Sequence, residues 1–307
     1  MLGENFWSKK NSNRNVPCKK FIVTVITILF LNKVIAQEID TLVNVGNYKL
    51  HFNITKGKGV PIFFESGAGN DGSIWDSIVK PLHDSLGTTL IRYDREGFGK
   101  SGIDTTNLNI IDEIKGLEAS LSKMGFAKKL FFVAHSLGGN YAMVFNQRNK
   151  GKVIGGVLID NPSPCFMTDK KAKEVKALFS DSIEVIKRES IGFYYILKNY
   201  EFTSKVMRDA SKFMTMPLTI ICSDSTPFES KERIIWKECL RNFAKEAKNR
   251  KFIMADKCGH YVFFDNPTLV IDAIIKQYRS LIKRVPNLRP TLSGVDEKPL
   301  QLKAPKI

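Results

Sequence analysis

The sequence predicts an α/β fold with a mostly parallel central sheet of about eight strands, flanked by helices and carrying an inserted helical lid. Two observations lead to this prediction. From residue 41 onwards, short apolar runs rich in β-branched residues alternate with amphipathic segments. Six of these runs are almost continuously apolar, as strands covered on both faces must be. Strands that alternate with helices form a parallel sheet with right-handed crossovers.

The elements are expected in a simple order along the chain. The runs TLVNV and YKLHFNIT form a hairpin around Gly46 and Asn47. The buried strands that follow are PIFFES, TTLIRYD, LFFVAHS, VIGGVLID, LTIICSD and KFIMAD. The helices expected between and after them are IWDSIVKPLHDSL, IIDEIKGLEASLSKM, LGGNYAMVFNQRN, SKERIIWKECLRNFAKEAKN and NPTLVIDAIIKQYRSLIKR.

Residues 161–216 interrupt this order, because they contain no strand-like run. They offer several helical pieces, including KKAKEVKALF, SIEVIKRES and GFYYILKNY. We interpret them as a helical lid inserted into a domain of residues 37–284. Residues 285–307 contain four prolines and little periodicity, so we expect a poorly ordered tail there.

Residues 1–36 are predicted to be a signal peptide. A basic stretch that ends in CKK precedes the apolar run FIVTVITILFL, and Val34 and Ala36 supply the small residues of a cleavage site. The run has 11 residues, which is short for a transmembrane helix. We therefore expect an exported protein, periplasmic or secreted. The alternative is an uncleaved N-terminal anchor, the one membrane attachment that we expect.

The composition argues against nucleic acid, nucleotide and metal as partners. The net charge is +16, of which residues 1–36 carry +5 (six Lys and Arg minus Glu4), and no Arg-rich run interleaved with aromatic residues follows. The sequence has no phosphate-binding Gly-rich loop, no His-x-x-x-His pair and no paired Cys motif. We therefore expect neither a cofactor nor a metal.

Four cysteines follow residue 36, and their spacing matches neither a disulfide scaffold nor a zinc site. Cys222 lies in the apolar run LTIICS, so we expect a small buried residue there. The sequence leaves open whether any of the cysteines pair.

The segment AHSLGG places Ser136 between an apolar strand and a helix-compatible stretch. Ala134 and Gly138 lie two positions to either side, where small residues are needed to expose a nucleophile on a sharp strand-to-helix turn. The N-terminus of the following helix would stabilise an anionic intermediate beside the serine. Ser136 is therefore the candidate nucleophile.

A serine nucleophile requires a general base, and His260 is the candidate. The chain has four histidines. His51 falls in the first hairpin and His83 in a surface helix, while His135 should point to the other side of its strand as a buried structural residue. His260 instead lies in a Gly-His loop where the last strand ends, in KFIMADKCGHYVFFDNP.

Four blocks occur in order along the chain: ESGAGNDGSIW, YDREGFGKS, AHSLGG and GHYVFFDNP. With these blocks the chain resembles the α/β-hydrolase fold superfamily over about residues 41–284, in particular its lid-bearing serine hydrolases of the esterase, peptidase and lactonase-like branch. The resemblance implies that the backbone N–H groups of Ala68 and Leu137 form the oxyanion hole. Ser66 stands where the family commonly has His, a departure that leaves the backbone donors in place. The charged pair in YDREGFGKS belongs to a family turn whose role is structural.

The acid of the triad is expected at one of two positions. The family usually carries it in a loop after the seventh strand, but the matching segment LTIICSDSTPFES has Thr226 there and Asp224 two residues earlier. Some relatives instead carry the acid at the end of the sixth strand, where Asp160 lies in VIGGVLIDNPSP. A triad acid orients the base and stabilises its protonated form. We favour Asp160 and keep Asp224 as the alternative, with Glu229 third.

The resemblance implies a serine hydrolase that cleaves an ester, thioester, lactone or small amide bond through a Ser136 acyl-enzyme, with His260 as general base. A serine at the turn separates the chain from the dehalogenases and epoxide hydrolases of this fold, which have Asp there. Aromatic residues of the lid would wall a pocket for the apolar acyl or alcohol group of a small-molecule substrate.

Two alternatives are kept. A proline-iminopeptidase-like aminopeptidase would need acidic lid residues to hold the substrate amine, and the candidates are Glu174, Asp181 and Glu184. A non-catalytic ligand-binding protein on the same fold would capture its ligand without turnover.

Overall fold

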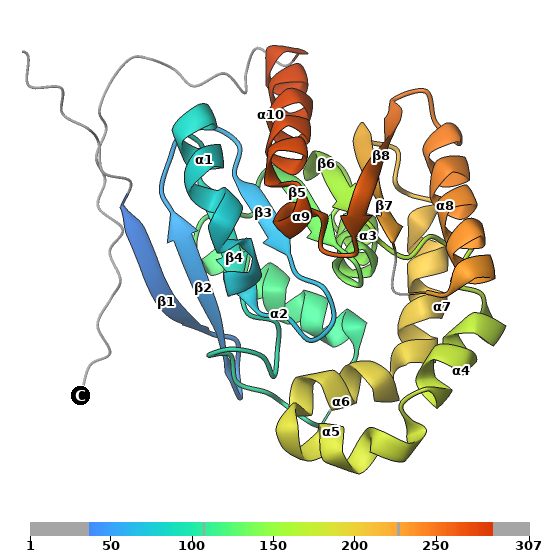
Figure 1. Cartoon of the computed structure of the whole chain (residues 1–307). Helices are drawn as coiled ribbons and strands as arrows, with labels where there is room; N and C mark the ends of the chain where they lie inside the picture. Colours follow the sequence, from blue (N-terminus) through green and yellow to red (C-terminus); the bar gives the residue numbers. More distant parts are fainter. Residues whose placement is uncertain (1–36, 107, 226–227, 285–307) are drawn as a thin grey trace, which may run out of the picture. The chain divides into compact units, whose positions relative to one another are not determined.

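The computed structural model describes residues 37–106, 108–225 and 228–284 (Figure 1). The predicted signal peptide (1–36), the predicted tail (285–307) and Thr226 lie outside the described residues. Among the helices that are described, none is long and apolar enough to cross a membrane.

The described residues form an eight-stranded sheet in the order β1-β2-β4-β3-β5-β6-β7-β8. β1 and β2 pair antiparallel as the predicted hairpin, β2 also pairs antiparallel with β4, and the other pairings are parallel. The mostly parallel sheet predicted from the sequence is thereby confirmed. Its strands are β1 (Glu38–Asn44), β2 (Lys49–Thr55), β3 (Ile62–Glu65), β4 (Leu90–Tyr93), β5 (Leu130–His135), β6 (Val153–Ile159), β7 (Leu218–Ser225) and β8 (Arg250–Gly259).

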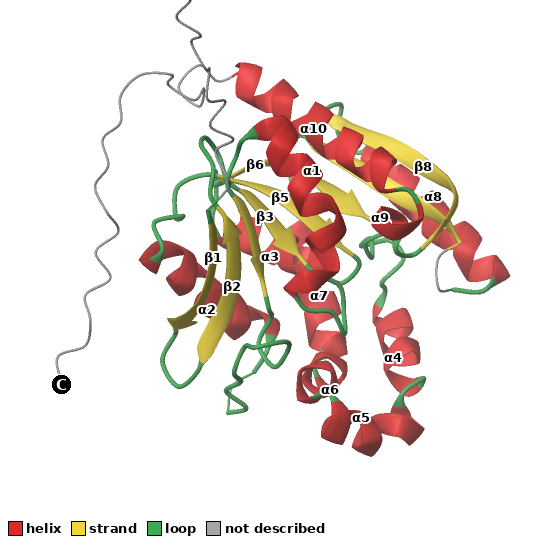
Figure 2. Ribbon diagram, turned by 60° about the vertical axis from the view of Figure 1, so that its left-hand side comes forward, coloured by secondary structure: helices red, strands yellow, loops and turns green. Residues whose placement is uncertain are grey.

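Helices cover both faces of the sheet (Figure 2). One face carries η1 (Gly72–Trp75), α1 (Asp76–Leu86), α9 (Val262–Asp265) and α10 (Pro267–Arg284). The other carries α2 (Ile110–Lys123), α3 (Gly138–Arg148) and α8 (Ser230–Lys245). In β3, Ile62 and Phe64 pack in the apolar cluster under α1 and α10, whereas Phe63 packs in the cluster under α2, α3 and α8. Because successive side chains point to opposite faces, a strand between two helical layers is apolar throughout.

A group of helices is inserted between β6 and β7 (Figure 1). Its members are α4 (Asp169–Ala177), η2 (Ser180–Ser182), α5 (Ile183–Glu189), α6 (Ile191–Lys198) and α7 (Tyr200–Ser211). The three helical pieces singled out in the sequence match α4, α5 and α6, and α7 has no counterpart among them. Side-chain hydrogen bonds join the insertion to the rest of the domain, among them those from Asn146 Nδ2 to Phe213 O (2.8 Å), from Asn199 Nδ2 to Leu108 O (2.7 Å) and from Lys171 Nζ to Glu232.

Cys165, in the loop after β6, forms a disulfide with Cys239 of α8. The sequence left this pairing open. The two cysteines are 74 residues apart, and the whole insertion lies between them. Cys222 is buried, as expected, and forms no disulfide; Cys258 is also buried and free.

Reduction of the disulfide is predicted to destabilise the fold. A cross-link over a loop of this length stabilises a protein by about 4 kcal/mol, because it restricts the unfolded chain. The urea midpoint of unfolding should therefore be lower with dithiothreitol than without it. Cys165→Ser is the control, since its midpoint should be low in both buffers. A parent protein with the same urea midpoint in the presence and absence of dithiothreitol would contradict the prediction.

Candidate active site

Ser136 lies at the sharp turn between β5 and α3. Its φ is 51°, a left-handed conformation that is uncommon for a residue other than glycine. Two backbone hydrogen bonds hold the turn, from Ser136 N to Ile159 O (3.0 Å) and from Gly139 N to Ser136 O (2.9 Å). This conformation is typical of a nucleophile held at the carboxyl edge of a parallel sheet.

Two glycines let the loop after β3 lie against this turn. A Cβ atom on Gly138 would lie 2.4 Å from the carbonyl oxygen of Glu65. One on Gly67 would lie 2.9 Å from His135 Nδ1 and 3.2 Å from Ser136 Cβ. A side chain at position 67 or 138 would therefore clash with these atoms. The two glycines allow the loop after β3 to lie against the N-terminus of α3 beside the serine.

His260, which directly follows β8, connects the serine to a carboxylate. Its Nε2 lies 2.9 Å from Ser136 Oγ, and its Nδ1 lies 2.6 Å from Asp160 Oδ2. We assign the ring proton to Nδ1, because a carboxylate can only accept. Nε2 is then the acceptor for the serine hydroxyl, which is the arrangement in which a histidine acts as general base.

Asp160 directly follows β6, and its side chain is buried. Its two oxygens accept four hydrogen bonds, from Ser223 N (3.0 Å), Ser223 Oγ (2.8 Å), Trp236 Nε1 (2.9 Å) and His260 Nδ1 (2.6 Å). Burial raises the pKa of this carboxyl, but the hydrogen bonds from His260, Ser223 and Trp236 outweigh burial and hold the pKa below its ordinary value. Asp160 is therefore a carboxylate that can stabilise a protonated His260.

Sequence reasoning did not find Ser223 and Trp236 as partners of the acid. Ser223 stands at the glycine position of a family motif, and Trp236 lies 76 residues from Asp160 along the chain. One signal was present in the sequence. An indole N–H on the apolar face of a helix requires a buried acceptor, and a buried Asp is such an acceptor.

Asp224, the alternative acid, does not lie at this position. Its carboxylate pairs with Lys237 Nζ at 2.7 Å, and its side chain is 47% exposed, against 0% for Asp160. Ser223 donates to Asp160. Asp224 lies where the pairing of β7 with β8 shifts register, and its carboxylate bonds to Lys237 and to the Lys257 amide instead. Glu229, ranked third, precedes α8 and is exposed.

His135 is buried behind the turn, as expected. Its Nε2 lies 3.0 Å from the carbonyl oxygen of His260, and the two rings pack with their centroids 4.6 Å apart. Burial lowers the pKa of His135 to about 3, so the ring is neutral and Nε2 donates to that carbonyl. His51 and His83 bond elsewhere, to Asp94 and to the carbonyl oxygen of Lys56.

The two expected oxyanion donors, Ala68 and Leu137, belong to the two segments that meet at Ser136. Leu137 immediately precedes α3, and Ala68 follows Gly67 in the loop after β3. Within the described part of the chain, neither amide donates to another protein atom, so both can bind an oxyanion. Ser66 Oγ donates to Asp71 O (2.9 Å) and accepts from the Trp75 indole (3.1 Å), so the residue in place of the family's histidine braces this loop.

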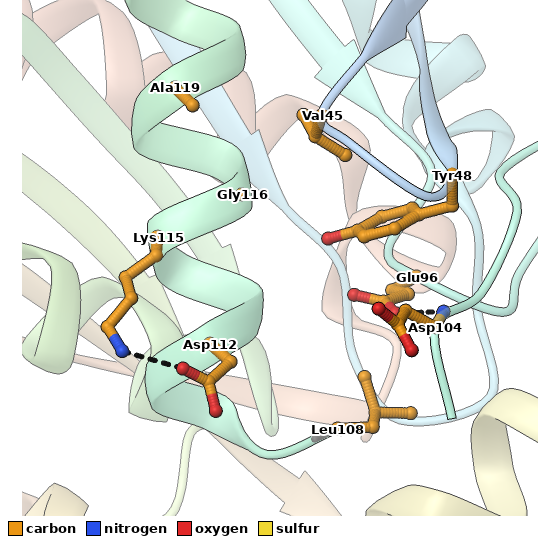
Figure 3. A pocket seen from close by; sticks show the side chains of 9 residues that line it. All are labelled: Val45, Tyr48, Glu96, Asp104, Leu108, Asp112, Lys115, Gly116 and Ala119. Atoms are coloured by element: carbon orange, nitrogen blue, oxygen red, sulfur yellow. Dashed lines mark hydrogen bonds and ion pairs between the residues drawn. The ribbon is translucent and has the colours of Figure 1, made fainter. Parts of the chain in front are cut away.

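A separate hollow of 230 Å³ opens between the β1–β2 hairpin and α2 (Figure 3). Glu96, Asp104 and Asp112 line it together with Tyr48. Asp112 pairs with Lys115 (2.7 Å), and Glu96 accepts from the Asp104 amide (2.6 Å). Ser136, His260 and Asp160 do not line this hollow. In the part of the chain that the structure describes, no cluster of His, Cys, Asp and Glu could hold a metal ion.

The chain is similar to several known proteins. A family model described as alpha/beta hydrolase fold matches residues 60–191. YqjL, an uncharacterized protein of Bacillus subtilis (strain 168), is 24% identical over 230 residues, which make up 70% of this chain and 82% of YqjL. A thermophilic esterase from Thermogutta terrifontis has a TM-score of 0.58 and 17% identity over 80% of this chain and 99% of its own. A putative ancestral haloalkane dehalogenase has a TM-score of 0.62 and 18% identity over 80% and 100%. At these identities the structures share the fold, and the chemistry has to be argued from the residues at the site.

Asp160→Asn is predicted to slow the reaction of Ser136 with a fluorophosphonate probe by roughly 10³- to 10⁴-fold, because an amide in place of the carboxylate holds His260 in the wrong tautomer. Asp224→Asn is the matched control, expected to react within about twofold of the parent as a surface change. The rate of labelling measures both. Equal slowing in the two variants, or slowing in Asp224→Asn alone, would count against Asp160 as the acid.

Lowering the pH is predicted to destabilise the protein through His135. The folded residue has a pKa of about 3 against an ordinary value of 6.5, so the unfolded chain binds the extra proton between these values. The stability due to neutral His135 is present in full above pH 6.5 and falls by about 1.4 kcal/mol per pH unit below it. Urea unfolding at pH 7 and pH 5 should show a shallower dependence in His135→Asn than in the parent; parallel dependences would refute the prediction.

Proposed function

We propose that this chain, which has the α/β-hydrolase fold, is a serine hydrolase that cleaves an ester, thioester, lactone or small amide bond. One observation carries the proposal. Ser136 Oγ, the His260 ring and the Asp160 carboxylate are joined by contacts of 2.9 Å and 2.6 Å in the order that a nucleophile, base and acid require.

The reaction proceeds through an acyl-enzyme. His260 Nε2 takes the hydroxyl proton as Ser136 Oγ attacks the substrate carbonyl carbon, and the carbonyl electrons move onto oxygen. The amides of Ala68 and Leu137 stabilise this oxyanion, aided by the N-terminus of α3. The oxyanion electrons then re-form the carbonyl and the bond to the leaving group breaks, while protonated His260, stabilised by Asp160, gives its proton to the leaving alcohol, thiol or amine. Water deprotonated by His260 then releases the acid from Ser136.

The identity of the nucleophile distinguishes between reactions that the fold supports. Dehalogenases and epoxide hydrolases of this fold have Asp at the turn, whereas this chain has Ser136. A serine hydroxyl activated by a histidine attacks a carbonyl carbon. Acyl transfer is therefore the reaction that Ser136 and His260 favour.

The insertion is proposed to contribute the apolar part of the substrate pocket. Phe166 is buried against Trp236, with ring centroids 4.9 Å apart, so we assign it to packing. Phe193, Tyr194 and Tyr195 on α6 are partly exposed. These three are the candidates to contact an apolar acyl or alcohol group of a small-molecule substrate.

The two alternative functions have less support. Glu174, Asp181 and Glu184, which an aminopeptidase would use to hold the substrate amine, are all exposed, and Glu174 pairs with Lys171 (3.5 Å). A ligand-binding protein without turnover would have no need of a base placed 2.9 Å from the serine.

Export from the cytoplasm is proposed as well. The Cys165–Cys239 disulfide supports it, because such bonds are rare in reducing compartments. Mass spectrometry of the mature N-terminus tests the proposal: loss of residues 1–36 is expected, and an intact chain in the membrane fraction would indicate an anchor.

The purified protein is predicted to hydrolyse 4-nitrophenyl esters with an initial burst of about one equivalent of nitrophenolate, because the acyl-enzyme forms before water cleaves it. Ser136→Ala and His260→Ala should each lower kcat by at least about 10³-fold. Ser180→Ala, an exposed serine of the insertion, is the control and should match the parent. If the folded parent neither hydrolyses esters nor reacts with a fluorophosphonate, the ligand-binding alternative replaces this proposal.

A further inference from the structure

A buried ion pair lies beside the loop that carries Ala68. Arg95 Nη2 lies 2.7 Å from Glu65 Oε1, and the two side chains are 2% and 0% exposed. Tyr93 OH donates to the same carboxylate at 2.9 Å, and the Arg95 guanidinium lies 4.0 Å from the centroid of the Tyr141 ring. The guanidinium is therefore held between the end of β3 and α3.

Arg95 also donates to two consecutive carbonyl oxygens of this loop. Its Nη2 donates to Ser66 O, and its Nη1 donates to Gly67 O (3.4 Å). The carbonyl group of Gly67 and the N–H of Ala68 belong to one planar peptide unit, in which they point in opposite directions. Holding Gly67 O towards Arg95 therefore turns the Ala68 N–H away from the ion pair, where it meets no other acceptor among the described residues.

The peptide unit on the other side of Ala68 is held as well. Asn70 Nδ2 donates to Ala68 O at 3.2 Å. Both peptide planes that include Ala68 are thus fixed by side chains. Gly67 lies against Ser136, so the orientation of these planes sets where the Ala68 N–H points relative to the nucleophile.

We propose that Arg95, anchored by Glu65, positions the Ala68 amide as an oxyanion donor. The proposal rests on the hydrolase activity proposed above and adds two positioning residues to it. Neither side chain contacts the substrate; each acts through the backbone of the loop. The turn that contains Arg95, for which the sequence indicates a structural role alone, thereby acquires a part in the reaction.

Stability alone is a poor explanation for this pair. Removing two charges from water opposes folding, and apolar residues of similar size often stabilise a protein as well as a buried ion pair does. Burial also raises the pKa of Glu65, against the effect of the adjacent Arg95. What apolar residues cannot provide is a planar group with several N–H donors that binds a carboxylate and two carbonyl oxygens at once.

Arg250 offers a matched comparison in the same chain. It donates to two carbonyl oxygens, Phe243 O (2.6 Å) and Met214 O (2.7 Å), pairs with Glu246 (3.0 Å) and lies 4.1 Å from the centroid of the Phe243 ring. It begins β8, at the opposite end of that strand from His260. Its contacts resemble those of Arg95, but none of them involves the site.

The experiment compares Arg95→Met with Arg250→Met in the full chain, by urea unfolding and by steady-state hydrolysis of a 4-nitrophenyl ester per folded molecule. Both variants should unfold at lower urea concentration. Arg95→Met should lower kcat roughly 10- to 100-fold, less than the 10²- to 10³-fold typical of losing a donor outright. KM should change little, because the lost interaction acts in the transition state. Arg250→Met should keep the kcat of the parent.

Two further variants separate positioning from stability. Glu65→Gln combined with Arg95→Met removes the buried negative charge that has lost its cation, so it should recover part of the urea midpoint while kcat stays low. Arg95→Lys keeps the charge but loses the planar fork; it should also lower kcat, and it serves if Arg95→Met does not fold. Recovery of kcat together with the midpoint, or a kcat in Arg95→Met equal to that in Arg250→Met, would overturn this inference and leave the proposed function standing. A parent without hydrolytic activity would overturn both.

Discussion

The arrangement of the site depends on one buried carboxylate. Asp160 has no exposed surface, so its charge must be balanced by donors from the protein. Those donors come from β7, from α8 and from the loop after β8, as Ser223, Trp236 and His260. The carboxylate can be buried only once these three segments lie in their final places, and the same placement brings His260 to Ser136. The hydrogen-bonded set of Ser136, His260 and Asp160 therefore forms as the carboxyl-terminal half of the sheet folds.

The parallel sheet makes this convergence possible. Neighbouring parallel strands end at the same edge, so side chains that follow β5, β6 and β8 meet there although they are distant in the sequence. Close backbone packing then completes the site, because glycines at 67 and 138 allow the loop after β3 to touch the start of α3. Behind this edge, neutral His135 supports the backbone of His260, so the base is held from the side chain and from the main chain.

Features that depend on residues close together in the sequence could be predicted, whereas contacts between distant residues could not. The strands, most helices and the turn at Ser136 depend on neighbours within a few residues, and periodicity and small flanking residues indicate them. The choice between Asp160 and Asp224 depends on which of the two carboxylates reaches His260, and the sequence of β7 does not say whether Ser223 or Asp224 points towards Asp160. Trp236 and the Cys165–Cys239 pair are contacts across more than seventy residues. Arg95 shows a further limit, since its motif indicates a turn and says nothing of the carbonyl groups that it binds.

The disulfide also determines what happens to the chain if its backbone is cut. Every peptide bond between Cys165 and Cys239 lies within a covalent ring, and the exposed loops of the insertion are in that ring. A protease that cleaves one of them leaves two pieces that remain joined, with Ser136 and Asp160 on the first and His260 on the second. β7, on the second piece, stays in the sheet between β6 and β8. If the protein is exported as proposed, a molecule cut once by a protease would therefore keep Ser136 and His260 in one covalently linked molecule.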